Sequence, residues 1–176
     1  MDGSADERIP DEGEIAGNVC TILAMLKAGK LHRSVAQQVV KGAIWMSSNR
    51  RGRWLWSPYF SRAALNAIAD NPNWRKDGEC VNDHIIPRAV IEREILGTDP
   101  SDADSIQRLL GLSFTCLLTK GEDQILRQIG LRQSMSDGSC LAEQQFTRYE
   151  RAGIVWVQGD LGRTELAHHG VSMPLD

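Results

Sequence analysis

Apolar residues recur at helical spacing through the first part of the chain. Residues 13–30 place them along one helix face, at Ile15, Val19, Ile22, Leu23 and Leu26. Residues 34–47 repeat the spacing, with Val35, Val39, Ala43 and Met46 on one stripe. A third helix is expected to begin at Ser61, a favourable N-cap, and to end at Asn71-Pro72. The N-terminal part of the chain is therefore predicted to be helical.

Strand-like segments occur from about residue 80 onward. Residues 80–86 form a predicted short strand that Pro87 closes, and residues 112–118 form a second, running into a turn at 119–121. Helices are predicted around these strands, at residues 88–96, 101–110, 122–129 and 141–152, and a small strand at 154–157. The sequence thus predicts an α+β fold that is mainly helical.

Length and charge refine the domain organisation. A chain of 176 residues that is 41% hydrophobic and 24% charged is typical of a single globular domain. We expect a disordered acidic leader at 1–12, a single globular domain at 13–159, and a weakly patterned tail at 160–176. Six acids and one base lie in residues 1–14, so the remainder is mildly basic although the net charge is −3. The acidity of the whole chain does not exclude a nucleic-acid partner.

The sequence also indicates the cellular location of the protein and the redox state of its cysteines. No run approaches the roughly 18 apolar residues of a membrane span, and no secretory signal is recognisable, so we expect a cytoplasmic protein without a membrane partner. The cysteines are scattered, without a Cys-x-x-Cys pair, and are expected to be free buried thiols. A partial zinc site of Cys80, His84 and Cys116 is the alternative. Structural zinc takes four closely spaced ligands, so zinc is not expected.

The segment Asn82-Asp83-His84-Ile85-Ile86-Pro87 carries the main chemical signal. An Asp-His pair, two apolar residues and a proline close one predicted strand, and a second strand precedes a helix with Glu122-Asp123 in its first turn. This order resembles the ββα-metal motif of the HNH, or His-Me finger, endonucleases, with the unit at about residues 80–130. The resemblance implies N-terminal helices holding a small ββα-metal unit.

The resemblance also implies roles for individual residues. Phosphodiester hydrolysis needs a base that deprotonates water and a cation that holds phosphate oxygens. His84 would be the base, Asp83 and Asp123 would bind Mg²⁺ or Mn²⁺, with Glu122 as the substitute for Asp123, and Arg88 would neutralise the phosphate. His84 and Asp123 or Glu122 are therefore expected to converge on one metal position. The sequence departs from the family in lacking a second-strand Asn and the zinc-binding cysteine pairs.

A basic-aromatic segment provides the second signal: Arg50, Arg51, Arg53, Trp54 and Trp56. Guanidinium groups bind phosphate in bidentate fashion and aromatic rings stack on bases, so this segment is a candidate nucleic-acid-binding surface. Two alternatives stay open. In the first, the tryptophans are core anchors and the arginines form a solvated rim. In the second, the segment binds a protein partner, since Arg and Trp dominate interface hot spots.

Two functional hypotheses result. The first is a metal-dependent nuclease of HNH type that acts on DNA, from a mobile-element or defence context. The second is a non-catalytic binding protein on an HNH-like scaffold, such as a phage-encoded inhibitor of a nucleic-acid-binding defence complex. A structural alternative makes Asp83-His84 a hydrogen-bonded polar strand end and Glu122-Asp123 a favourable helix N-terminus.

Overall fold

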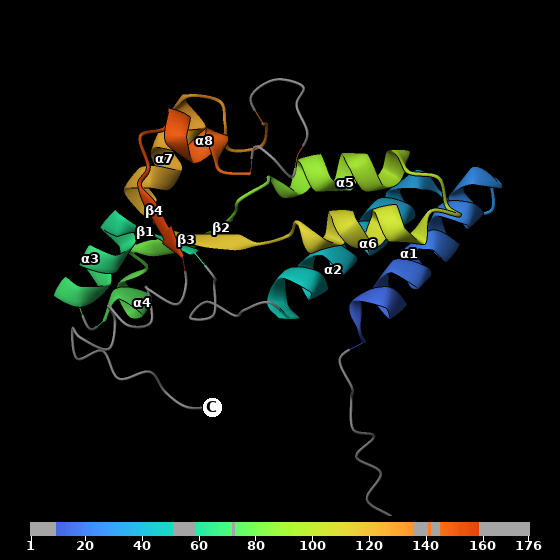
Figure 1. The fold of residues 1–176 in the computed structure, drawn as a ribbon, viewed down its shortest axis with the longest axis horizontal. Coiled ribbons are helices and arrows are strands. Elements are labelled where there is room, and N and C mark those ends of the chain that lie inside the picture. The colour runs from blue at the N-terminus through green and yellow to red at the C-terminus, as the bar shows by residue number, and fades with distance from the viewer. Residues whose placement is uncertain (1–9, 51–58, 72, 136–140, 142–144, 159–176) are drawn as a thin grey trace, which may run out of the picture.

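The computed structural model describes residues 10–50, 59–71, 73–135, 141 and 145–158 (Figure 1). It is an α+β fold and mainly helical, as the hydrophobic pattern predicts. A group of helices lies at one end of the molecule, and a small sheet between helices lies at the other (Figure 1). No helix in the described ranges is both long and apolar enough to cross a membrane.

The four helices at one end are α1 (Glu12–Lys27), α2 (Arg33–Arg50), α5 (Arg88–Gly97) and α6 (Ala103–Gly111). Their apolar faces meet in one core, made mainly by Ile15, Val19, Leu23, Val40, Ile44, Ile91, Ile95, Ile106 and Leu110. Helix α1 begins inside the predicted leader, because Asp11 and Glu14 form a reciprocal capping box there.

The predicted stripe of α2 is confirmed in its second half, where Ala43 is buried and Met46 packs against the core, and is wrong by one position in its first half. Ala36, Val40 and Ile44 are fully buried, whereas Val35 is 46% exposed. Both stripes have helical spacing, so the pattern of α2 alone does not choose between them. Packing against the other helices of the bundle selects the stripe with the buried isoleucine.

Within the described residues, the sheet has four strands in the order β2-β3-β1-β4. These are β1 (Tyr59–Ser61), β2 (Cys80–His84), β3 (Thr115–Thr119) and β4 (Trp156–Gln158). β2 pairs antiparallel with β3, β3 parallel with β1, and β1 antiparallel with β4. The sequence does not predict strand β1, because three residues are too few to show alternation.

Helices cover both faces of this sheet (Figure 1). α3 (Arg62–Asp70) and α4 (Trp74–Asp77) cover one face, where Phe60, Leu65, Ile68, Trp74, Cys80 and Leu117 form a core. α7 (Lys120–Gln128) and α8 (Thr147–Arg151) cover the other, where Ile85, Cys116, Leu118, Leu126, Tyr149 and Ile154 form a second core. Ser61 caps α3 as predicted, since its hydroxyl accepts a hydrogen bond from the Ala64 N–H.

Two boundaries differ from the prediction. The expected turn at 119–121 is absent from the described structure, because Thr119 ends β3 and directly caps α7, which begins at Lys120. The last predicted helix is described only as α8, five residues long, and residues 142–144 lie outside the described residues.

The connection between β2 and β3 determines where the candidate site lies. β2 and β3 are neighbours in the sheet, yet α5 and α6 lie between them in sequence. These two helices leave the sheet and pack into the bundle with α1 and α2. The segment from His84 to Arg88 is therefore the junction between the sheet and the helical bundle.

Candidate functional site

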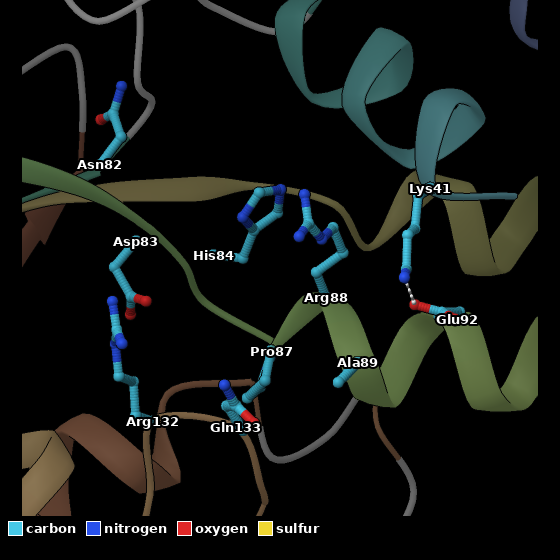
Figure 2. A pocket seen from close by; sticks show the side chains of 10 residues that line it. All are labelled: Lys41, Asn82, Asp83, His84, Pro87, Arg88, Ala89, Glu92, Arg132 and Gln133. Atoms are coloured by element: carbon cyan, nitrogen blue, oxygen red, sulfur yellow. Dashed lines mark ion pairs between the residues drawn. The ribbon is translucent and has the colours of Figure 1, made fainter. Parts of the chain in front are cut away.

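The strand β2 sends its polar side chains to opposite faces of the sheet. Asp83 lies opposite Cys116 in β3, and His84 lies opposite Thr115. Because side chains alternate along a strand, Asp83 shares the face of α7 and α8, and His84 shares the other face with Asn82. Figure 2 shows this directly, with Asp83 beside Arg132 and His84 beside Arg88. No bulge brings the two side chains together.

Asp83 is held by two residues of α8. Tyr149 donates a hydrogen bond of 2.7 Å to its Oδ2, and the Arg148 guanidinium forms an ion pair with the same oxygen. Only 15% of the Asp83 side chain is exposed. Burial raises the pKa of Asp83, although Arg148 and Tyr149 act in the opposite direction. The carboxylate is thus part of a buried polar network.

Arg148 is completely buried and is the centre of that network. Its Nε donates to the Ile85 carbonyl at 2.8 Å and its Nη1 to the Leu131 carbonyl at 3.0 Å. Its Nη2 donates to Asp83 and to the His84 carbonyl. A buried charge is tolerated when its donors are satisfied in this way. Arg148 therefore fixes the backbone at the end of β2, where the candidate site begins.

Asp123 is also paired with arginines. Arg127 Nη2 lies 3.1 Å from Oδ2, and Arg132 Nε lies 3.2 Å from Oδ1. Both carboxylate oxygens are occupied, and only 12% of the side chain is exposed. The charge of Asp123 is neutralised within the protein.

Glu122 has a structural role at the start of α7. It forms a capping box with Thr119, whose backbone N–H donates to Glu122 Oε2 at 2.8 Å. The same oxygen accepts a hydrogen bond of 2.6 Å from the Ser61 hydroxyl. Glu122 thereby joins the beginning of α7 to the end of β1.

The residues expected to bind a metal do not fit one. Divalent Mg²⁺ or Mn²⁺ needs carboxylate oxygens free to coordinate it. Asp83 and Asp123 are engaged by arginines, Glu122 by its cap, and His84 lies on the other face of the sheet. Among the described residues, no group of three or more His, Cys, Asp or Glu side chains is placed to hold an ion. The expected convergence of His84 with Asp123 or Glu122 is not found.

The described cysteines are free thiols, as predicted. Cys80 and Cys116 are buried on opposite faces of the sheet, so they do not form a zinc site with His84. Burial raises the pKa of Cys80 to about 11 and that of Cys116 well above its usual range. These thiols are packing residues. Cys140 lies outside the described residues.

His84 has an unusual environment for a polar strand end. Its Nε2 is buried and has no hydrogen-bond partner within the described structure. Burial, together with the charges of Arg88 and Arg148, lowers the pKa of His84 to about 4. The imidazole is therefore neutral at pH 7. The structural alternative, a hydrogen-bonded strand-end histidine, is not what the structure shows at Nε2.

His84 lines a polar cavity of about 340 Å³ at the junction of sheet and bundle (Figure 2). Among the described residues, three cationic side chains line it, from three parts of the chain: Lys41 of α2, Arg88 of α5 and Arg132 after α7. Two acids, Asp83 and Glu92, also line it. Asp83 is neutralised by Arg148, and Glu92 lies 4.0 Å from Lys41.

Arg88 is the least compensated charge of this cavity. It is exposed and has no ion-pair partner within the described part of the chain. It occupies the first turn of α5, whose N-cap, Pro87, supplies no side-chain hydrogen bond. The first N–H groups of a helix have no partner within the helix, and they favour an anion. The cavity is therefore suited to an anionic group.

The basic-aromatic segment is mostly beyond what the structure describes. Arg50 ends α2, and Arg51, Arg53, Trp54 and Trp56 lie outside the described residues. An aromatic side chain that the sequence did not indicate as a nucleic-acid-binding residue lies one helical turn from Lys41. This is Trp45, which is 60% exposed.

The sequence assigned no role to four further residues of the site, Lys41, Arg132, Arg148 and Tyr149, and none to Asn82 individually. Lys41 and Arg132 do not belong to any sequence motif. They line the cavity because of how α2 and the segment after α7 pack in the folded protein. Arg148 and Tyr149 lie 65 and 66 residues from Asp83 in sequence. The only local signal was Asn82, next to the Asp-His pair.

Comparison with protein-family models, with curated proteins and with solved structures gives no match.

Proposed function

We propose that this protein binds the phosphodiester backbone of a nucleic acid at the cavity around His84, and that it acts as a binding protein. The observation that carries the proposal is the cavity itself, which Lys41, Arg88 and Arg132 line together with His84, whose buried Nε2 has no partner among the described residues. Phosphate oxygens accept hydrogen bonds from Arg and Lys and from helix N-termini. Trp45, exposed one turn from Lys41, offers a surface on which a base can stack.

Binding is favoured over metal-dependent hydrolysis by the state of the carboxylates. A cation at Asp83 would have to displace the buried Arg148, and a cation at Asp123 would have to displace Arg127 and Arg132. Removing Arg148 from Asp83 is strongly unfavourable because that ion pair is buried, whereas Arg127 and Arg132 are partly exposed. The arrangement instead uses positive side chains to neutralise the acids and leaves Arg88 available for a ligand.

The test is a binding titration with fluorescein-labelled single-stranded and duplex DNA at two salt concentrations. Arg88→Gln is expected to weaken binding and to reduce the log–log salt slope by about one unit, as for one lost phosphate contact. Arg93→Gln is the matched control, since Arg93 is exposed on the same helix and pairs with Glu94 at 3.0 Å. Equal affinities for Arg88→Gln and the parent protein would refute the proposal.

A plasmid-nicking assay with Mg²⁺ or Mn²⁺ separates binding from hydrolysis. We expect no cleavage above the background of a His84→Ala preparation. Cleavage that His84→Ala slows by about two to four decades, the usual contribution of a general base, would favour the nuclease hypothesis instead.

A further inference from the structure

Two buried polar atoms without a hydrogen-bond partner among the described residues lie on the same face of β2. They are Oδ1 of Asn82 and Nε2 of His84, and both residues line the cavity. Alternate residues of a strand are separated by about 6.6 Å, at about 3.3 Å of rise per residue. Figure 2 shows both side chains extending from one side of β2 and Asp83 from the other. Both residues therefore border the cavity, and because the two atoms are closed to solvent, a ligand group reaches them only when the side chains turn toward the cavity.

Such atoms are uncommon in folded proteins because a buried acceptor without a donor is unfavourable. A strand position that tolerates one is a candidate for a functional position. An apolar side chain would fit at position 82, since a leucine there would continue the apolar face formed by Cys80 and Leu117. The amide in the strand therefore has no evident packing role.

The cavity also has room for more than a phosphate group. Its volume of about 340 Å³ falls within the range of about 300–1,000 Å³ that is usual for sites that bind small organic molecules. A phosphate held by Arg88 and the first turn of α5 would leave the Asn82 end of the cavity for the rest of a nucleotide.

We propose that Asn82 determines specificity in this cavity, by accepting a hydrogen bond from a donor group on the nucleotide whose phosphate lies at Arg88. This inference rests on the proposed binding of a phosphodiester backbone. The donor is an N–H of the base or the 2′-hydroxyl of a ribose, both of which present a hydrogen to an amide oxygen. His84 Nε2, two residues further along β2, contacts the same nucleotide nearer its phosphate.

The experiment compares the parent protein with Asn82→Leu on three labelled single-stranded oligomers of equal length. One is an abasic phosphodeoxyribose chain, one a deoxyribonucleotide and one a ribonucleotide of the same base sequence. Gln128→Leu is the control, because Gln128 is an exposed amide on α7. Thermal unfolding of each protein is measured in parallel.

We expect Asn82→Leu to bind the abasic chain as well as the parent protein does. A base donor predicts a loss of about tenfold on both base-bearing oligomers, and a ribose donor predicts that loss on the ribonucleotide alone. The melting temperature of Asn82→Leu should be equal to or higher than that of the parent, because the unpartnered oxygen is gone. Gln128→Leu should match the parent in every measurement.

The remaining outcomes distinguish a failure of the role given to Asn82 from a failure of the proposed nucleic-acid binding. If Asn82→Leu and the parent bind all three oligomers alike, Asn82 does not read the nucleotide, while backbone binding stands. An equal loss on all three oligomers, or a lower melting temperature, makes Asn82 a structural residue. If the parent binds none of the three, the proposed function fails and the inference fails with it.

Discussion

The hydroxyl of Tyr149 donates a hydrogen bond of 2.7 Å to the carboxylate of Asp83, across 66 positions of sequence. The neighbouring Arg148 binds the same carboxylate and also the backbone carbonyls of His84 and Ile85. Together they attach the five-residue helix α8 to the end of β2. A helix this short is not stable by itself, so these contacts hold it in place.

Arg148→Met is expected to lower the free energy of unfolding by about 3–5 kcal/mol, because it leaves Asp83 buried without its cation. Tyr149→Phe removes one hydrogen bond and should lower it by about 1 kcal/mol. Arg151→Met, at an exposed position of the same helix, should change it by less than about 0.5 kcal/mol. Urea denaturation gives the three values. A similar value for Arg148→Met and Arg151→Met would contradict the role given to the buried arginine.

Glu122→Ala is expected to destabilise the protein by roughly 1–2 kcal/mol, because Thr119 and Ser61 both lose their acceptor. Gln124→Ala, exposed on α7, is the control and should be close to neutral. Thermal or urea unfolding measures both. Full stability in Glu122→Ala would show that the capping box contributes nothing to the fold.

The sequence was informative where structure depends on neighbouring residues. Ser61 caps α3, and Pro87 precedes α5 at Arg88, because capping and proline geometry are set within a few positions. The predicted order of strand, strand and helix also appears, as β2, β3 and α7. These features need no knowledge of the rest of the fold.

The chemistry of the acids was not predictable in this way. Asp83 and Asp123 have the residue types of metal ligands, but their state depends on Arg148 and Arg132, which no local pattern connects to them. The cavity has the same origin, since Lys41 reaches it through the packing of α2 beside α5. Periodicity identifies the buried side of an element, whereas the partner of a buried charge is fixed by tertiary structure.

Divalent cations should not stabilise the protein. A cation bound by the folded state raises the melting temperature, and the rise grows with the logarithm of the ratio of cation concentration to Kd. With Asp83 and Asp123 paired to arginines, millimolar Mg²⁺ or Mn²⁺ and an excess of EDTA should give the same melting temperature. A rise with Mn²⁺ that disappears in Asp123→Asn would show that the ion replaces the arginines, and it would restore the metal hypothesis.

Stability should respond to the protonation of His84. Its pKa falls from 6.5 to about 4 on folding, so the unfolded chain binds a proton between these values and the folded chain does not. Above pH 6.5 the effect is absent. As the pH falls from 6.5 to 4, His84 should reduce the stability by up to about 3 kcal/mol.

His84→Leu isolates this contribution, since the acidic groups titrate in both proteins. The difference in unfolding free energy between the variant and the parent should grow as the pH is lowered through this window. Proton NMR should give a midpoint for the His84 ring of about 4, with the variant identifying its signal. A midpoint near 6.5 would mean that the ring is solvated and that the cavity does not enclose it.

The basic-aromatic segment, which begins at the end of α2, gives the last prediction. Replacing Arg50, Arg51 and Arg53 with Ala removes three candidate phosphate contacts, each worth nearly one unit of the log–log salt slope for duplex DNA. If the segment extends the binding surface that we place at Arg88, the triple variant should bind DNA more weakly, with a slope shallower by up to about three.

The same titration distinguishes the alternatives for this segment. A protein-binding surface predicts an unchanged slope and a partner whose binding depends on Trp54 or Trp56 through apolar burial, with weak salt dependence. If the arginines instead pack their stems on the core, circular dichroism will show that the triple variant has lost helix. Combining the triple variant with Arg88→Gln adds a further test. If the phosphate contacts are independent, the two sets of substitutions should reduce the salt slope additively. If Arg88→Gln reduces the slope and the triple substitution does not, nucleic-acid binding is confined to the cavity.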